Sequence, residues 1–234
     1  GANPIRSGNN VWAKNQHFDE NLPTILLNSH HDTVKPNAGY TRDPFSPTVE
    51  GDQLFGLGSN DAGGPLVSLL ATFLFYSTQK KLPYNLIFAG TAEEEISGKN
   101  GIAALLPELR KFDLGIIGEP TFVVDVRTNE CYSNEEAFEL INANTSSELT
   151  PRSFRLNSSS IDLNHPIVQR GIELGRTTYG SPTLSDQALI PFPTLKIGPG
   201  DSARSHTADE FILLSEIETG ISLYIDLLKD LKIG

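Results

Sequence analysis

The sequence has little cysteine, few basic residues and no long apolar run, and each shortage excludes a class of protein. The single cysteine, Cys131, excludes an internal disulfide and fits a reducing cytoplasm, which is the expected location. Eighteen Lys and Arg against 29 Asp and Glu give a formal net charge of −11, which repels nucleic-acid phosphates and anionic lipids. We therefore expect neither a nucleic-acid partner nor a membrane partner.

Long apolar segments are also missing. No stretch approaches the roughly 18 consecutive apolar residues of a membrane span, and the first residues have neither a cationic region nor an apolar core. The sequence therefore predicts no transmembrane helix and no signal peptide. Its 234 residues, 38% of them hydrophobic, contain no internal repeat. We predict a single globular domain over residues 1–234.

Short aliphatic or β-branched runs are followed by polar, glycine-rich loops and, in places, by helical patterns. The runs expected to be strands are 24–28, 85–89, 114–117, 122–126 and 194–197. They are too apolar for a sheet with a solvated face, so helices are expected on both sides. The expected helices are 64–78, 134–142, 166–175 and 214–231, and the Ser-rich segment 146–162 is interpreted as a surface excursion. This is the pattern of an α/β domain with three layers, α/β/α, around a mixed, largely parallel sheet.

Imidazole and carboxylate groups follow several of the expected strands. They are His30, Glu94, Glu95, Glu119 and His206, and Asp61 lies in the loop GLGSNDAGG that precedes a helix. Because the carboxyl ends of parallel strands share one edge of a sheet, these side chains can converge. Imidazole and carboxylate without thiolate are the ligands expected for zinc, cobalt or manganese at a hydrolytic site. The pattern therefore favours a metal hydrolase.

Each of these residues also has an ordinary structural interpretation. Asp61 could cap the helix that begins near Pro65, and the acidic triplet 93–95 could be a solvated helix start. Glu119 could occupy a turn, and His206 could be an exposed loop residue. These interpretations are independent of one another, whereas a metal site explains all of the residues together.

Motifs of other enzyme classes are missing. GLGSND lacks the third glycine of a dinucleotide loop and is not followed by Gly-Lys-Ser/Thr. Neither Gly-x-Ser-x-Gly nor His-Glu-x-x-His occurs, which argues against a serine hydrolase of that type and against the common one-zinc protease. Cys131 follows a polar Thr-Asn-Glu and is interpreted as an incidental thiol.

Five motifs, SHHDTVKP, GLGSNDAGG, TAEEE, GEPT and SHTADEF, occur in the order found in a known family. They resemble the co-catalytic zinc amidohydrolases, which include acetylornithine deacetylase, succinyl-diaminopimelate desuccinylase, aminoacylase and glutamate carboxypeptidase. The resemblance covers nearly the whole chain and implies a zinc-exopeptidase-like catalytic domain with two divalent metal ions. It implies that His30, Asp61 and Glu119 hold one ion. Asp61, Glu95 and His206 would hold the other, with Zn2+ as the expected metal and Co2+ or Mn2+ as alternatives.

The resemblance also implies roles for the residues around the metals. Asp32 would orient the imidazole of His30, and Glu94 would be the general base. In the implied mechanism the cations lower the pKa of a water molecule, and Glu94 takes its proton and returns a proton to the leaving amine. His31 would not be a ligand.

The resemblance of two sequence segments to one member of the family suggests the substrate. The segments HHDTVKPNAGYTRDPFSPTVEG and TYGSPTLSDQA look most like acetylornithine deacetylase, which implies an N-acyl amino acid such as N-acetylornithine or a close arginine-pathway analogue. Arg204 is a candidate for binding the substrate carboxylate, although a loop arginine is often a surface residue. Ser185 and Asp186 are candidates for the pocket lining, with a helix cap as their alternative role.

Three other functions stay open. Succinyl-diaminopimelate desuccinylase-like and dipeptidase activities would use the same metal core. A noncatalytic metal-binding scaffold is the alternative from a different class, and the presence of Glu94 argues against it because that residue is not needed to hold metal.

The chain departs from the family pattern between residues 121 and 122. Family members insert a lid or dimerisation domain after GEPT, whereas GIIGEPTFVVDVRT places two strand-like runs almost back to back. The resemblance therefore implies that the lid is missing from this chain. The full-length protein is expected to be a homodimer and the lid-less chain a monomer. The missing domain normally supplies a histidine that stabilises the oxyanion, so metal binding should survive while turnover can be lost.

Overall fold

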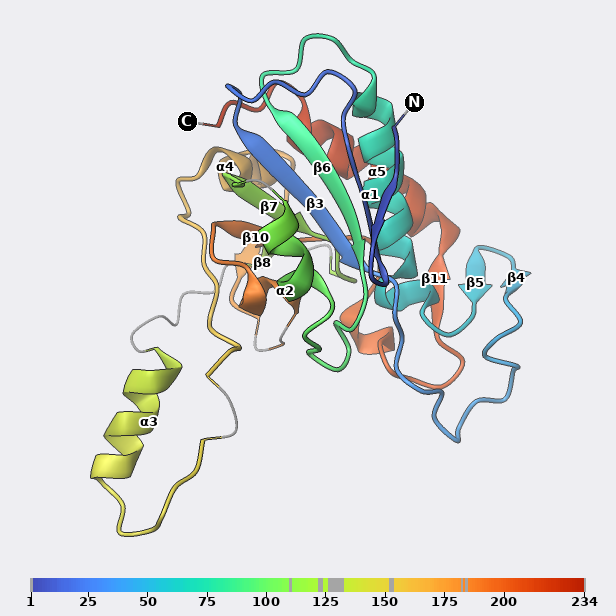
Figure 1. Ribbon diagram of the computed structural model, residues 1–234. Helices are drawn as coiled ribbons and strands as arrows, with labels where there is room; N and C mark the ends of the chain where they lie inside the picture. The colour runs from blue at the N-terminus through green and yellow to red at the C-terminus, as the bar shows by residue number, and fades with distance from the viewer. Residues whose placement is uncertain are drawn as a thin grey trace.

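The computed structural model describes residues 2–109, 111–121, 124–125, 133–151, 154–181, 183 and 185–233. Its main sheet has eight strands: β1 Ile5–Ser7, β2 Asn10–Lys14, β3 Thr24–His30, β6 Asn85–Thr91, β7 Leu114–Ile117, β8 Val124–Asp125, β9 Thr178–Tyr179 and β10 Thr194–Lys196. Their order across the sheet is β1-β2-β6-β3-β7-β10-β8-β9 (Figure 1).

The middle of this sheet is parallel. β3 runs parallel to β6 on one side and to β7 on the other, and β7 runs parallel to β10. The antiparallel pairs lie towards the edges, where β2 pairs with β6 and with β1, and β8 pairs with β10. The mixed, largely parallel sheet predicted from the sequence is confirmed, and its four central strands end at one edge.

Helices cover both faces of the sheet. Helix α1 (Gly64–Ser77) packs against α5 (Leu214–Leu228) on one face, and α4 (Pro166–Glu173) lies beside α5 (Figure 1). The other face is covered by α2 (Ile102–Leu105) and the helical turns Leu106–Glu108 and Asp186–Leu189. Side chains alternate between two cores, since Leu27 packs on the α1 and α5 side and Leu26 on the α2 side. The predicted three-layer fold is therefore confirmed. The helical layer formed by α2 and the two short turns contains fewer helical residues than the layer formed by α1, α4 and α5.

A second, antiparallel sheet lies beside the start of α1. Its strands are β4 (Thr48–Glu50), β5 (Gln53–Phe55) and β11 (Phe211–Leu213), in the order β11-β5-β4. A helical turn, Ser59–Gly63, precedes α1, and another, Ser202–Arg204, precedes β11. The first turn contains Asp61, and the second ends two residues before His206.

Helix α3 (Asn134–Ala143) stands away from the rest of the fold and has no buried residue (Figure 1). It begins as predicted, because the hydroxyl of Ser133 accepts a hydrogen bond from the backbone N–H of Glu136. The predicted strand 122–126 is represented by β8 alone. Its remaining residues and Cys131 lie outside the described residues. Among the described residues, no helix is both long enough and apolar enough to cross a bilayer.

Candidate metal centre

Parallel strands bring imidazole and carboxyl groups to one edge of the main sheet. β3 ends at His30, which is paired in register with Thr91 at the end of β6. Glu94 and Glu95 follow β6, and Glu119 follows β7 after one glycine. Because these strands run in the same direction, their carboxyl ends coincide. The side chains therefore meet although they are far apart in sequence.

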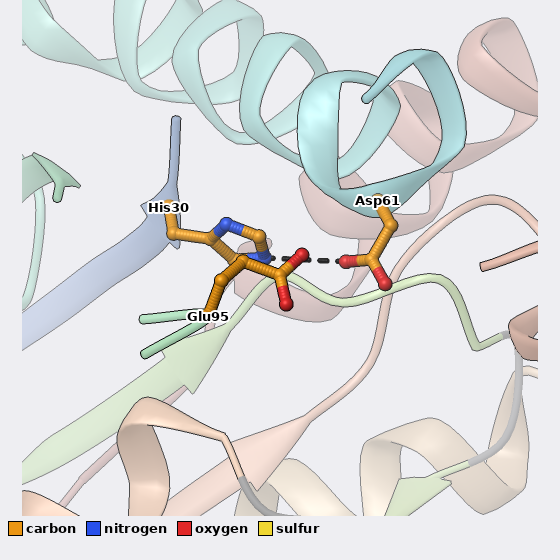
Figure 2. A group of neighbouring side chains, drawn as sticks. All are labelled: His30, Asp61 and Glu95. Atoms are coloured by element: carbon orange, nitrogen blue, oxygen red, sulfur yellow. Dashed lines mark hydrogen bonds and ion pairs between the residues drawn. The ribbon is translucent and has the colours of Figure 1, made fainter. Parts of the chain in front are cut away.

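Asp61 lies between two imidazoles. Its Oδ1 is 3.2 Å from Nε2 of His30, and its Oδ2 is 3.6 Å from Nε2 of His206. Glu95 lies on the His206 side, with Oε2 3.1 Å from the same His206 nitrogen. His30, Asp61 and Glu95 offer ligand atoms that all lie within 4.8 Å of one another (Figure 2). These distances are short enough for metal coordination around Asp61.

Glu94 and Glu119 approach the same nitrogen of His30. Their nearest oxygens lie 3.9 and 4.0 Å from Nε2. Burial raises the pKa of both carboxyls, and the charge of Glu119 raises the pKa of Glu94 further. The raised pKa values favour the protonated forms of these carboxyls when no cation is bound.

Asp32 supports both His30 and the acidic loop. Nδ1 of His30 lies 3.0 Å from the backbone carbonyl oxygen of Asp32 and 3.6 Å from its Oδ1. A carbonyl can only accept, so Nδ1 bears a proton and Nε2 faces the carboxyls. The two carboxylate oxygens of Asp32 accept hydrogen bonds from the backbone N–H groups of Glu94 and Glu95, each at 3.2 Å. This geometry suits the supporting role expected of Asp32.

The donor set fits divalent cations. Burial alone would lower the pKa of His30, but its hydrogen bonds to Asp32 and Asp61 raise that pKa overall. In the cation-free protein the imidazolium is thus a positive charge among several partly buried carboxyls. Bound cations would supply more positive charge there, and the two oxygens of Asp61 face different imidazoles, as a bridging carboxylate requires.

A cavity of about 520 Å³ opens over the centre. Its acidic side is formed by Asp61, Glu94, Glu95 and Glu119, with His206 beside them. Its lining also includes the polar residues Tyr179, Ser181, Thr183, Lys196, Ser202 and Ser205. This volume suits a small organic molecule.

Arg204, the predicted ligand of the substrate carboxylate, does not line this cavity. Its Nη1 and Nη2 donate hydrogen bonds to the two carboxylate oxygens of Glu216, at 2.6 and 2.9 Å. Its guanidinium also lies over the ring of Phe211, 4.7 Å from the centroid. The geometry argues against the predicted role, because the bidentate contact with Glu216 occupies the fork that would grip a substrate.

Ser185 and Asp186, predicted to line the pocket, are not among the residues that line this cavity. The hydroxyl of Ser185 accepts a hydrogen bond from the backbone N–H of Gln187, which is the capping role given above as the alternative. Asp186 is 3% exposed and accepts hydrogen bonds at 2.8 Å from Asn28 and Thr91. These contacts join Asp186 to β3 and β6 beneath the centre.

Two residues that the sequence interpretation missed contribute to this region. Lys196 is buried in β10, lines the cavity and donates to Oγ1 of Thr183 at 2.9 Å. Glu210 is buried against the loop that contains Asp61. Lysine within the apolar run TLKI was a usable signal for the first. The position of Glu210 four residues after His206 was not a usable signal.

Comparison with known families identifies the chain. Residues 26–230 match the model of Peptidase family M20/M25/M40. The chain belongs to this family. Acetylornithine deacetylase of Edwardsiella ictaluri (strain 93-146) is 27% identical to this M20 chain over 207 residues, which are 86% of the chain and 51% of that protein. Succinyl-diaminopimelate desuccinylase of Blochmanniella floridana is 34% identical over 128 residues, 50% of the chain and 33% of that protein.

The M20 fold is also seen in solved structures. The di-peptidase Dug1p of Saccharomyces cerevisiae gives a TM-score of 0.64 at 12% identity, covering 98% of the M20 chain and 86% of Dug1p. At this identity the likeness establishes the fold alone. The chain spans about half or less of the length of the curated M20 relatives described above.

Proposed function

We propose that this chain is the catalytic part of a metal-dependent amide hydrolase that removes the acyl group from an N-acyl amino acid such as N-acetylornithine. The placement of Asp61 between two imidazoles, with Glu94 beside them, is the main support. The relative named acetylornithine deacetylase, which matches 86% of the chain, supports the substrate class.

The two metal positions share Asp61. His30 and Glu119 would complete one position, and Glu95 and His206 would complete the other. When bound, divalent cations supply Lewis acidity that polarises a carbonyl and acidifies water. Zn2+ is the proposed metal, with Co2+ and Mn2+ as alternatives of the same ligand preference.

Glu94 would move the protons of the reaction. It lines the cavity, and its backbone is held by Asp32, so its carboxyl faces the space a substrate amide would occupy. There it would accept a proton from the attacking water and donate a proton to the leaving amine. Asp32 would act through His30 and through the backbone of Glu94, as a positioning residue.

Lys196 replaces Arg204 as the proposed partner of the substrate carboxylate. Its ammonium lies in the wall of the cavity that also contains Ser181 and Thr183, whose hydroxyls accept its hydrogen bonds. The acidic side of the same cavity would repel a carboxylate until cations are bound. A substrate would therefore be oriented with its amide towards the carboxyls and its carboxylate towards Lys196.

We also propose that a lid domain belongs between residues 121 and 122 of the natural enzyme. Support comes from the limited length of the curated relatives that the chain spans. In that form the enzyme would be a homodimer. A version with the lid inserted is therefore the appropriate protein for turnover, whereas metal binding can be measured on the chain itself.

A substrate panel combined with metal analysis tests this function. The chain loaded with Zn2+ should bind two ions, and the version with a lid should release acetate from N-acetylornithine. N-succinyl-diaminopimelate and small dipeptides test the functions of the desuccinylase relative and the di-peptidase neighbour. Two bound ions with hydrolysis of none of these amides would favour the noncatalytic scaffold.

A further inference from the structure

Two segments distant in sequence form one unit beside the candidate metal centre. The first, residues 58–61, precedes α1 and ends at Asp61. The second, residues 201–210, precedes β11 and contains His206. Two buried polar side chains, Asn60 and Glu210, join them.

Glu210 binds the backbone of the first segment through both carboxylate oxygens. Oε1 accepts from the backbone N–H groups of Asp61 at 2.8 Å and Asn60 at 3.1 Å. Oε2 accepts from the backbone N–H of Gly58 at 2.9 Å. Glu210 is 2% exposed, so water has little access to these N–H donors and could not readily replace the carboxylate as their acceptor.

Asn60 completes the connection in the opposite direction. Its Oδ1 accepts from the backbone N–H of Asp201 at 3.1 Å. Its Nδ2 donates to the backbone carbonyl of Asp201 at 3.1 Å and to Oγ of Ser205 at 3.4 Å. The residue before Asp61 thus holds the residue before His206, while Glu210 holds Asp61 itself.

We propose that Glu210 is a positioning residue that sets Asp61 opposite His206 before any cation arrives, and so determines the affinity of the outer metal position. Outer here means the position that Asp61, Glu95 and His206 would form, so the inference rests on the proposed function. His206 lies in a loop with a positive φ of 60° and has a 53% exposed side chain. Its side chain therefore depends on local contacts rather than on a strand for its position.

Asp209 offers a matched control from the adjacent position. Its carboxylate also accepts backbone hydrogen bonds, from Thr41 at 2.9 Å and Arg42 at 3.0 Å, but it does not contact the loop of Asp61. Both Asp209→Asn and Glu210→Gln remove one negative charge. Asparagine also tolerates the positive φ of Asp209.

Titration of the metal-free chain with Co2+ tests the proposal, with calorimetry for affinity and visible absorption for coordination. Wild type should bind two ions. Glu210→Gln places an amide NH2 group near the N–H of Gly58 or of Asp61, and should weaken the outer ion about 10- to 100-fold with an altered Co2+ spectrum. Asp209→Asn should match wild type. Glu210→Asp, which keeps the charge on a shorter side chain, should restore part of the affinity.

Three results overturn the inference. The first is a Glu210→Gln variant with the Co2+ affinity and spectrum of wild type. The second is an Asp209→Asn variant that loses as much affinity for the outer ion as Glu210→Gln does. The third is a metal-free wild type in which the backbone amides of Gly58, Asn60 and Asp61 are unprotected in hydrogen exchange. The exchange measurement requires no variant and therefore applies even if Glu210→Gln does not fold. Failure of wild type to bind two ions would instead reject the proposed function.

Discussion

The two histidines of the centre have the same chemistry and opposite surroundings. His30 ends β3, a strand buried along its whole length, and its side chain is 1% exposed. His206 follows a short helical turn, and half of its side chain is exposed. Sheet register places the first imidazole, whereas hydrogen bonds between two loops hold the segments around the second.

This difference predicts unequal metal positions. The inner position, which His30, Asp61 and Glu119 would form, contains one buried ligand, His30, and two that are only 13% and 12% exposed. The outer position depends on His206 and on the loops that Glu210 and Asn60 hold together. The proposed ions should therefore differ in affinity and rate of exchange, although their ligand types are alike.

The largest expected effect is a loss of turnover, without loss of either metal ion, when Glu94 is replaced. Glu94→Gln should lower turnover by about 10²- to 10⁴-fold, because it removes the proposed general base and acid. Both ions should still bind, since Glu94 belongs to neither position. The measurement is the turnover number of the lid-containing version together with metal content of the chain. Turnover equal to wild type would remove Glu94 from the mechanism.

Replacing each histidine in turn tests the inequality directly. His206→Ala should weaken only the outer ion, by more than the roughly 10- to 100-fold typical of lost supporting residues. His30→Ala should abolish the inner ion and lower the melting temperature, because several buried carboxyls lose their imidazole partner. Zinc titration and thermal unfolding of the metal-free chain measure both. Equal behaviour of the two variants would contradict the division into inner and outer positions.

Lys196, which is buried, and Arg204, which is partly buried, allow a similar comparison. Lys196→Met should raise the KM for an N-acyl amino acid by about 10- to 100-fold, since a hydrogen bond to a charged group contributes about 1.5–3 kcal/mol. Arg204→Met should leave KM unchanged and lower the melting temperature, because Arg204 is paired with Glu216. An N-acyl amine without a carboxylate serves as the control substrate and should not distinguish Lys196→Met from wild type.

The smallest effect is a dependence of metal affinity on pH. In the cation-free protein the pKa values of His30 and Glu119, which would hold the inner ion, are both raised, so their protons compete with a cation. Cations must displace those protons, and affinity should rise with pH by roughly tenfold per unit for each proton displaced. The outer ion should also displace a proton, because burial raises the pKa of Glu95, which would hold that ion. Calorimetry in buffers of different ionisation enthalpy counts the protons, and binding without release would contradict the assignment.

The sequence predicted the buried elements better than the short ones. β3, β6 and α1 follow from long apolar patterns, and their observed bounds lie within two residues of those expected. β4, β5 and β11 contain three residues each and were not predicted. Such short strands are stabilised by their partners rather than by their own composition.

The role of Arg204 could not be settled from sequence for a related reason. Its partner Glu216 follows 12 residues later, on α5, and nothing in the intervening sequence signals that pairing. Lys196 was overlooked as a candidate ligand because the apolar run TLKI, although it contains a lysine, does not indicate which face of the strand opens onto a cavity. Both cases concern side-chain direction rather than the choice of element.

By itself, the sequence determined the α/β class, the central strands and the set of imidazole and carboxyl groups at their ends, because local apolar patterning and parallel strand direction suffice for these. Only the tertiary structure decided which cation faces the cavity and how Asp61 comes to lie between His30 and His206. Those features depend on hydrogen bonds between segments far apart along the chain, such as that from the backbone of Asp61 to Glu210, and such contacts exist only once the fold has formed.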